Sequence, residues 1–327
     1  MRRPSVRWVP AAYTEAIASA RLRCYRPARA LAEAGWNSRI LTRHLPSRPD
    51  VVVFQKAYGP AHLALASRMQ RRGAAVVFDL CDNHFYATSD DPRSAERVER
   101  LRRMIGLADV VTASTPTLAS RIDHPRVVVV DDAIDVAGPA LDASPVTRRR
   151  LVWFGNAGSE AEHYGMADLG AILHDLSQVA KTVSCELVVV SNSAPAFERY
   201  VGGSGLEARY QPWTPASVER ALRSADIALL PVQANEFTLC KTANRVVTSL
   251  LHGLATVAGR IPSYEEFSPY IRFESWQEHV GAYLADPELR AGDVAGGQAY
   301  IADRFPPGHL GEQWAGALEW AVAARAS

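Results

Sequence analysis

The 327-residue sequence has no long apolar run and few cysteines. No stretch approaches the roughly 20 consecutive apolar residues that a membrane-spanning helix needs, and the start MRRPSVRWVP lacks the apolar core of a secretory signal peptide. The four cysteines form no CxxC pair and accompany no histidine cluster at metal-ligand spacing. These absences argue against a transmembrane protein, a disulfide framework and a zinc site. They predict a cytoplasmic protein with reduced thiols.

Net charge is also nearly absent, with 36 basic residues against 35 acidic ones. A balanced chain is not held to a polyanion by bulk electrostatics, so we expect no nucleic-acid partner. The many arginines leave peripheral contact with an anionic membrane surface as an alternative. Neither half offers GxGxxG after its first strand, which disfavours a dinucleotide-dependent dehydrogenase. No DxD motif stands at a convincing place, and the adjacent Asp90 and Asp91 are interpreted as a turn, so no metal site is predicted.

Short Val-rich runs alternate with helix patterns along the chain, which is typical of a parallel sheet buried on both faces. GLADVVTAS (106–114) and RSADIALLP (223–231) share a helix end, Ala-Asp and a buried strand, and thus indicate two similar α/β halves. We expect an N-terminal domain over 1–143 and a C-terminal domain over 144–327, joined by a Pro- and Gly-containing linker near 138–150. A closing amphipathic helix over 311–324 is predicted to pack back on the first domain, with Trp314, Leu318 and Val322 on one face.

The segment from Asn235 to Pro262 follows the apolar run 227–232, which is predicted to be a strand. The segment itself is predicted to form a loop, a helix that ends at Gly253, and then a short strand. Near the helix start lie Lys241, Asn244 and Arg245, two cations and an amide beside the positive end of a helix dipole. Such an arrangement can bind phosphate, particularly in a loop that leaves the carboxyl end of a strand. The alternative is a solvated basic first turn.

These features together resemble the GT-B glycosyltransferases, in particular bacterial enzymes similar to family 4. The resemblance covers nearly the whole chain and rests on VWFGNAG, SADIALLPV and LLHGLATVAG in the second half, and on SARLRCYRPARALAEAGW and VVFDLCDNHF in the first. It implies an α/β fold of two Rossmann-like, doubly wound domains facing a central cleft. It also implies transfer of a sugar from a nucleotide-diphosphate sugar to a glycan, lipid-linked or small-molecule acceptor, in bacterial surface glycan or glycoconjugate synthesis. No cofactor beyond the donor is expected.

The resemblance places donor binding mainly in the second half. Backbone amides at Gly155 and Asn156 would approach the diphosphate, which Lys241 and Arg245 would neutralise. For Trp213 the alternative is plain packing, and the Gly-Asn-Ala-Gly turn could merely reverse the chain. The full set of predicted donor contacts is Gly155, Asn156, Ser191, Asn192, Trp213, Glu236, Phe237, Lys241, Asn244 and Arg245.

One departure from the family pattern concerns a pair of glutamates that many retaining relatives carry. Counted back from Gly253, their places fall on Cys240 and Thr248, neither of which is acidic, and Glu236 is the nearest acid before them. The family's donor-sugar and ribose contacts are therefore not transferred, and the stereochemical outcome stays open. The alternatives are a sugar-nucleotide 2-epimerase of the same fold, a non-catalytic nucleotide- or glycan-binding subunit, and an inactive copy.

In the first half, polar residues follow strand ends. Asp82 and His84 are the predicted bases for the acceptor hydroxyl, against the alternative that the aspartate only caps a turn. Further residues predicted to contact acceptor or cleft are Arg21, Arg23, Gln55 and Lys56.

Overall fold

The computed structural model describes residues 3–41, 48–86, 92–136, 138–145, 147–159 and 164–326, so the predicted turn at Asp90 and Asp91 lies outside the described residues. Its contacts divide the chain into two compact units. Unit 1 comprises Met1–Ala133, Cys240–Thr242 and Phe305–Ser327. Unit 2 comprises Ile134–Leu239 and Ala243–Arg304.

Unit 1 is built on a six-stranded parallel sheet with the order β2-β1-β3-β4-β5-β6. The residues of β1, β3, β4 and β5 are all buried, which explains why these strands are continuous apolar runs instead of alternating ones. The strands are β1 (Val6–Pro10), β2 (Ser38–Ile40), β3 (Val51–Gln55), β4 (Ala75–Leu80), β5 (Val110–Ala113) and β6 (Val127–Val129).

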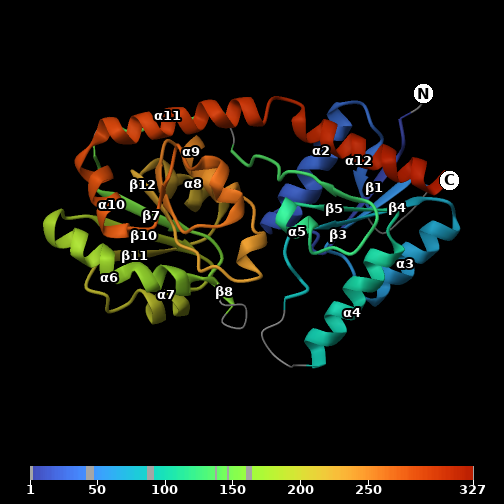
Figure 1. The fold of residues 1–327 in the computed structure, drawn as a ribbon, viewed down its shortest axis with the longest axis horizontal. Coiled ribbons are helices and arrows are strands. Elements are labelled where there is room, and N and C mark those ends of the chain that lie inside the picture. Colours follow the sequence, from blue (N-terminus) through green and yellow to red (C-terminus); the bar gives the residue numbers. More distant parts are fainter. Residues whose placement is uncertain are drawn as a thin grey trace. The chain divides into compact units, whose positions relative to one another are not determined.

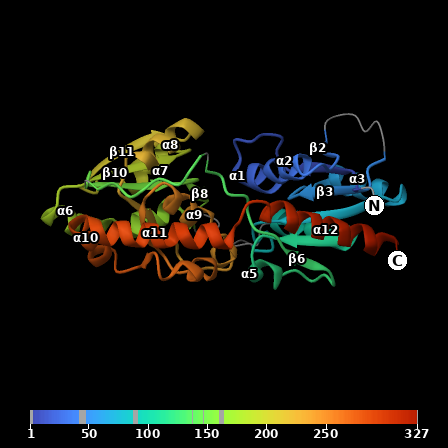
Figure 2. The ribbon, with the colours of Figure 1, turned by 90° about the horizontal axis from the view of Figure 1, so that it is seen from above.

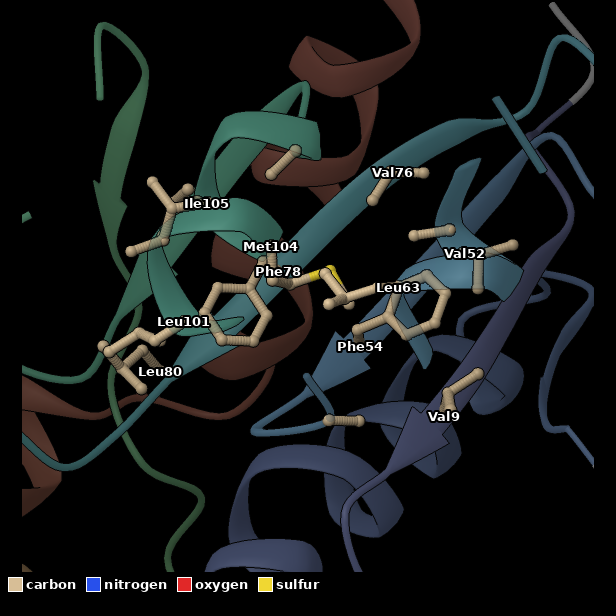
Figure 3. Packing of buried hydrophobic residues seen from close by; sticks show 14 of the residues in the cluster. Val9, Val52, Phe54, Leu63, Val76, Phe78, Leu80, Leu101, Met104 and Ile105 are labelled. Carbon is tan, nitrogen blue, oxygen red and sulfur yellow. The ribbon is translucent and has the colours of Figure 1, made fainter. Parts of the chain in front are cut away.

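Helices cover both faces of this sheet (Figure 1). Phe54 and Phe78 point from the sheet to Leu63 of α3 and to Leu101 and Met104 of α4 (Figure 3). The opposite face packs on α2 and on α12, a helix from the far end of the chain. The helices are α1 (Ala18–Ala20), the π-helical turn η1 (Arg21–Tyr25), α2 (Arg26–Glu33), α3 (Pro60–Arg71), α4 (Pro92–Leu107), α5 (Pro116–Ala119) and α12 (His309–Ala326).

Unit 2 repeats the plan with the parallel order β11-β10-β7-β12-β13-β14. The order reverses between β7 and β12, the switch point at which such sheets bind ligands beyond their carboxyl ends. The strands are β7 (Arg150–Phe154), β10 (Glu186–Ser191), β11 (Glu207–Pro212), β12 (Ile227–Leu230), β13 (Ala255–Ala258), β14 (Arg272–Phe273) and the antiparallel pair β8 (Gly158–Ser159) and β9 (Tyr164–Gly165).

The helices of unit 2 also cover both faces of its sheet. α6, α7 and α10 pack on the face that carries Leu151, Leu187 and Leu229. On the other side, α11 lies alongside α9 (Figure 2). The helices are α6 (Met166–Thr182), α7 (Ala194–Tyr200), α8 (Pro215–Arg223), η2 (Thr238–Cys240), α9 (Asn244–Leu251), η3 (Pro262–Phe267), α10 (Trp276–Ala285) and α11 (Pro287–Arg304).

The sequence predicted the segment after Asn235 correctly as helix, glycine and strand. α9 runs over Asn244–Leu251, Gly253 has a φ of +76° and β13 follows. A residue in this left-handed conformation ends a helix at little cost only when it lacks a β-carbon. The predicted α/β class with two doubly wound sheets is confirmed.

Candidate functional site

The turn after β7, at the switch point of unit 2, is shaped by two asparagines. Asn192 Oδ1 accepts from Ala157 N at 2.8 Å, and Asn156 Oδ1 accepts from Gly158 N at 2.8 Å. Gly155 N donates to Val190 O at 3.0 Å. Three of the four amides of Gly155–Gly158 thus donate within the protein, and the side chain beside the turn is the more available anion ligand.

That side chain is Arg245, in the first turn of α9. Its guanidinium carbon lies 5.4 Å from the centroid of the Trp153 ring and 5.3 Å from that of Phe154. A β-carbon built on Gly155 would stand 3.7 Å from the same carbon, which places Arg245 directly against the turn. Its Nε and Nη2 are buried and have no hydrogen-bond partner among the residues that the structure describes. Burial lowers the pKa of Arg245, with Tyr264 and Asp168 as weaker opposing influences.

Arg245 therefore has buried N–H donors of a kind that proteins normally pair with a hydrogen-bond acceptor. A buried charged group without a partner is costly, and native structures contain few such groups. A ligand with negative oxygens would supply the missing acceptors. We call Trp153, Phe154, Gly155 and Arg245 the Arg245 site.

Asp168 braces two loops of unit 2 near Arg245. From the first turn of α6 its carboxylate accepts from Gly165 N at 3.0 Å and from Gln233 N at 3.3 Å. Gly165 ends the β9 strand and Gln233 follows β12, so a single buried carboxylate fixes both segments. Burial raises its pKa, whereas the two amides and Arg245 act in the opposite direction.

The other predicted donor contacts of unit 2 lie at strand ends. Trp213 N donates to Ser191 O at 2.8 Å, which brings the carboxyl ends of β10 and β11 together. Ser191 is fully buried and its hydroxyl donates to Asn192 Oδ1 at 3.3 Å. Phe237, in the loop with Glu236, is 4% exposed and packs on Tyr164 at 4.9 Å between ring centroids. Its ring is thus part of the packing of this loop.

Lys241 is placed in unit 1, apart from the unit that holds Arg245. Its Nζ lies 2.6 Å from Asp82 Oδ1, and Lys56 Nζ lies 2.5 Å from Asp82 Oδ2. Lys56 directly follows β3 and has a φ of +53°, an uncommon conformation for a residue other than glycine. We call Lys56, Asp82 and Lys241 the Asp82 cluster. The sequence had joined Lys241 to Arg245 in one phosphate site, whereas the structure pairs the lysine with a carboxylate.

The two predicted bases are both weak in this setting. Burial raises the pKa of Asp82, but Lys241 and Lys56 outweigh it and hold that pKa well below the usual range. Burial and the charge of Lys56 lower the pKa of His84 to about 3. The imidazole is accordingly neutral near pH 7, with Nδ1 2.8 Å from the Tyr58 hydroxyl. A base works best when its pKa is near the working pH, and both pKa values are shifted away from it, so the role of either group as the base stays a prediction.

Arg23 is buried instead of facing a ligand. It is fully buried in η1, with Nη2 2.6 Å from Asp79 Oδ1, and it also donates to Val130 O. Its charge is therefore neutralised inside unit 1. Arg21 donates to Glu15 O at 2.5 Å, and Gln55 is 1% exposed with its amide 3.9 Å from Cys81 Sγ. Together with Lys56, which is paired with Asp82, all four predicted acceptor contacts thus have partners within unit 1.

Three consecutive residues of unit 1 cross the carboxyl ends of three neighbouring strands. Cys240 O accepts from Thr115 Oγ1 after β5 at 3.2 Å, Lys241 reaches Asp82 after β4, and Thr242 Oγ1 donates to Asp132 Oδ2 after β6 at 2.7 Å. Cys240 also belongs to the apolar core of this unit. The place of the first family glutamate is therefore occupied by a buried core residue. The place of the second, Thr248, lies half-buried in α9.

Across the described ranges, no group of three or more His, Cys, Asp or Glu side chains could hold a metal ion. No helix within those same ranges is long and apolar enough to cross a membrane.

Sequence reasoning did not single out Asp132 or Asp168. Asp132 comes just after the run VVVV, so the strand-end argument that selected Asp82 applies to it equally. Asp168 stands three residues after Gly165 at a helix start, a spacing at which an acidic side chain caps the first turn.

Searches with family models and among curated proteins found no match to this chain. Solved structures do match. TarM from S. aureus, in complex with fondaparinux, α-GlcNAc-glycerol and UDP, superimposes with a TM-score of 0.61 at 10% identity, over 82% of this chain and 55% of that one. HepE from Anabaena, in complex with UDP, gives 0.65 at 13% identity over 96% and 99%. A glycosyltransferase from Rickettsia africae gives 0.59 at 10% identity over 99% and 98%.

The chain spans about half the length of TarM and nearly all of HepE. At this level of identity the comparison establishes architecture. Together with the two parallel sheets, it shows that the chain has the GT-B fold.

Proposed function

We propose that this chain is a glycosyltransferase that moves a sugar from a nucleotide-diphosphate sugar to an acceptor hydroxyl, with the diphosphate bound at the Arg245 site. One observation carries the proposal: at the switch point of a nucleotide-binding type of sheet, the half-buried Arg245 has two buried nitrogens, Nε and Nη2, with no hydrogen-bond partner among the described residues. Two similar structures, TarM and HepE, were solved in complex with UDP, which supports UDP as the nucleotide.

The diphosphate fits the Arg245 site on chemical grounds. Guanidinium forms short, charge-assisted hydrogen bonds to phosphate oxygens, and its planar fork can engage two oxygens at once. Sugar transfer leaves additional negative charge on the departing diphosphate. A fixed cation in a buried place stabilises that charge strongly, because little solvent screens it. Arg245 would thus serve both binding and reaction.

Calorimetric titration with UDP, GDP, CDP and dTDP tests the proposal and names the donor class. We expect one nucleotide to bind the parent protein and to bind Arg245→Ala at least ~10-fold more weakly, since a hydrogen bond to a charged group contributes about 1.5–3 kcal/mol. Arg245→Lys should retain part of the affinity. Arg223→Ala, which removes an arginine that is 48% exposed in the same unit, is the matched control.

Two outcomes would contradict this assignment. If no nucleotide binds the parent, the chain has no sugar-nucleotide site, and a non-catalytic binding role is favoured. If Arg245→Ala binds as tightly as the parent and keeps its melting temperature, the diphosphate lies elsewhere. Where a nucleotide does bind, analysis of the reaction products separates transfer of the sugar to an acceptor from 2-epimerisation of the donor.

Metal independence is part of the proposal, because Arg245 supplies the counter-charge that a divalent ion would otherwise provide. UDP affinity and turnover should be the same with EDTA and with magnesium. Loss of both in EDTA would overturn this part.

The same proposal includes an acceptor on a glycan or lipid-linked intermediate, and peripheral contact of unit 1 with an anionic membrane from the cytoplasmic side. The membrane contact is supported by the charge of unit 1, which carries 23 arginines and lysines against 15 acidic residues. Unit 2 carries 13 against 20.

A further inference from the structure

The Asp82 cluster of unit 1 holds two positive charges and one negative charge. Lys56 Nζ lies 2.5 Å from Asp82 Oδ2, and Lys241 Nζ lies 2.6 Å from Asp82 Oδ1. The three side chains are shielded but not sealed from solvent, since Lys56 keeps 17% of its surface exposed, Asp82 15% and Lys241 31%. An excess charge in such a place is costly unless a further group of opposite sign compensates it.

Lys56 has more hydrogen-bond donors than the protein occupies. A lysine ammonium carries three N–H donors, and among the described residues only Asp82 accepts from Lys56 Nζ. The neighbouring carboxylates Asp79 and Asp132 form ion pairs with Arg23 instead. Lys56 also has a φ of +53°, a left-handed conformation that is strained for a residue with a β-carbon. Such strain is found where a particular side chain is needed for function, which singles out this lysine.

His84 adds an uncharged hydrogen-bond donor beside the cluster. The Tyr58 hydroxyl lies 2.8 Å from its Nδ1, and the two rings meet edge-on with centroids 5.8 Å apart. When the hydroxyl donates to Nδ1, the neutral ring carries its proton on Nε2, which has no partner among the described residues. The charges around the ring are mainly positive, since Lys56, Arg97 and Lys241 add to the effect of burial in lowering its pKa, with the cluster carboxylate as the opposing charge. A ring N–H in such surroundings suits an oxygen with negative charge.

We propose that the Asp82 cluster and His84 bind an anionic group of the acceptor, a phosphate or a carboxylate. The inference rests on the sugar transfer proposed above and names the class of acceptor that unit 1 selects. Lys56 and Lys241 supply the positive charge, as lysines do in binding phosphate, and His84 Nε2 donates a directed hydrogen bond. A neutral acceptor would leave the excess charge of the lysines uncompensated, so the same groups discriminate against it.

Three sugars that differ in charge test the proposal: glucose 6-phosphate, glucuronate and glucose itself. Each is titrated calorimetrically into Arg245→Ala, a variant without the other candidate anion site. We expect at least one of the two anionic sugars to bind about 10-fold more tightly than glucose, the effect of a hydrogen bond to a charged group. Tighter binding of the phosphate indicates a phosphate-bearing acceptor such as a lipid-linked intermediate, and tighter binding of glucuronate indicates an acidic glycan.

Removal of the Lys56 charge gives a matched test in the same background. Lys56→Gln should weaken binding of the anionic sugar about 10-fold and leave any binding of glucose unchanged. The control is Lys181→Gln, because Lys181 is an exposed lysine of α6 in unit 2, outside the Asp82 cluster. A Lys56→Gln protein that keeps its melting temperature and its affinity for the anionic sugar overturns the proposal.

Proton–nitrogen NMR of the imidazole rings gives a readout in the parent protein that needs no change at Lys56. The ring signal that is lost in His84→Gln should shift on addition of the anionic sugar and stay in place with glucose. A signal that stays in place with both, or equal affinity for all three sugars, overturns the proposal. UDP binding at Arg245 is measured separately and is unaffected by either result, so failure here is distinct from failure of the proposed function.

Discussion

At the scale of single residues, the two cations predicted for one phosphate site differ in their partners: Lys241 is hydrogen-bonded to a carboxylate, whereas Asp168 acts on Arg245 through its charge. Lys241 shares Asp82 with Lys56, so its charge is largely committed within unit 1. Within the described part of the chain, Arg245 Nε and Nη2 are buried and have no hydrogen-bond partner. Folding alone would penalise such an arrangement, whereas a bound anion would compensate it. The unsatisfied residue is therefore the stronger functional candidate.

Backbone conformation at a single glycine gives a stability prediction. Gly253 has a φ of +76°, and an added β-carbon would stand 2.4 Å from Asp142 O. The backbone that carries this oxygen is held in place by the hydrogen bonds of the preceding residue. Leu141 N donates to Leu251 O at 3.0 Å, and Gln298 Nε2 donates to Leu141 O at 2.8 Å. We expect Gly253→Ala to lower stability by at least about 2 kcal/mol, measured as a lower melting temperature.

The matched control for that change is another glycine of the same unit. Gly281 lies within α10, and nothing stands within 4 Å of an added β-carbon. Alanine is favoured over glycine inside a helix by about 0.5–1 kcal/mol, so Gly281→Ala should leave the melting temperature unchanged or raise it. Equal destabilisation by both changes would contradict this explanation.

At the scale of elements, α12 completes the core of unit 1 although it comes last in the chain. Trp314 is fully buried, with its ring edge-on to Trp8 at 4.7 Å between centroids and beneath the Arg23 guanidinium at 5.5 Å. The helix thus covers the sheet on the side where α2 also packs.

Replacing this tryptophan should destabilise unit 1 selectively. We expect Trp314→Ala to cost about 3–5 kcal/mol, the range for removing a large core aromatic. Hydrogen exchange should become faster in β1 and β4, while strands of unit 2 keep their protection. Trp320, on the same helix but 42% exposed, is the control, and Trp320→Ala should change stability by less than about 0.5 kcal/mol. Similar losses for both variants would show that α12 contributes little to the core.

The same scale explains which elements could be predicted from the sequence. Strands such as Val51–Gln55 and Ala75–Leu80 are recognisable because burial on both faces demands unbroken apolar runs. Helices such as α11 are harder to predict, since Gly292, Gly296 and Gly297 interrupt the pattern where Gly297 packs against Leu250. Strand order is not encoded locally at all.

The candidate site was predictable to the extent that its residues follow strand ends. That argument found Gly155, Asp82 and Arg245, and it would have found Asp132. It did not predict which charged residues form ion pairs, because Lys241 and Asp82 are 159 positions apart in the sequence and Arg23 and Asp79 are 56 apart. Whether a charge is neutralised or available is decided by such long-range contacts, and it is this property that distinguishes Arg245 from Arg23.

At the scale of the whole molecule, the near-zero net charge conceals two units of opposite sign, +8 for unit 1 and −7 for unit 2. Part of the positive excess lies on α3 and α4, where Arg68, Arg71, Arg102 and Arg103 are exposed. A basic surface near an anionic bilayer gains about 1 kcal/mol for each arginine or lysine, and the gain is screened within about 8 Å at physiological salt.

Unit 1 should therefore bind vesicles that contain anionic lipid. We expect the protein to sediment with vesicles of phosphatidylglycerol and phosphatidylcholine but not with phosphatidylcholine alone, and to be released by salt. The double change Arg102→Glu and Arg103→Glu on α4 should abolish sedimentation. The double change Arg220→Glu and Arg223→Glu, at the exposed end of α8 in the acidic unit, alters net charge equally and should leave binding unchanged. Equal loss in both variants would mean that overall charge, and not the surface of unit 1, governs the interaction.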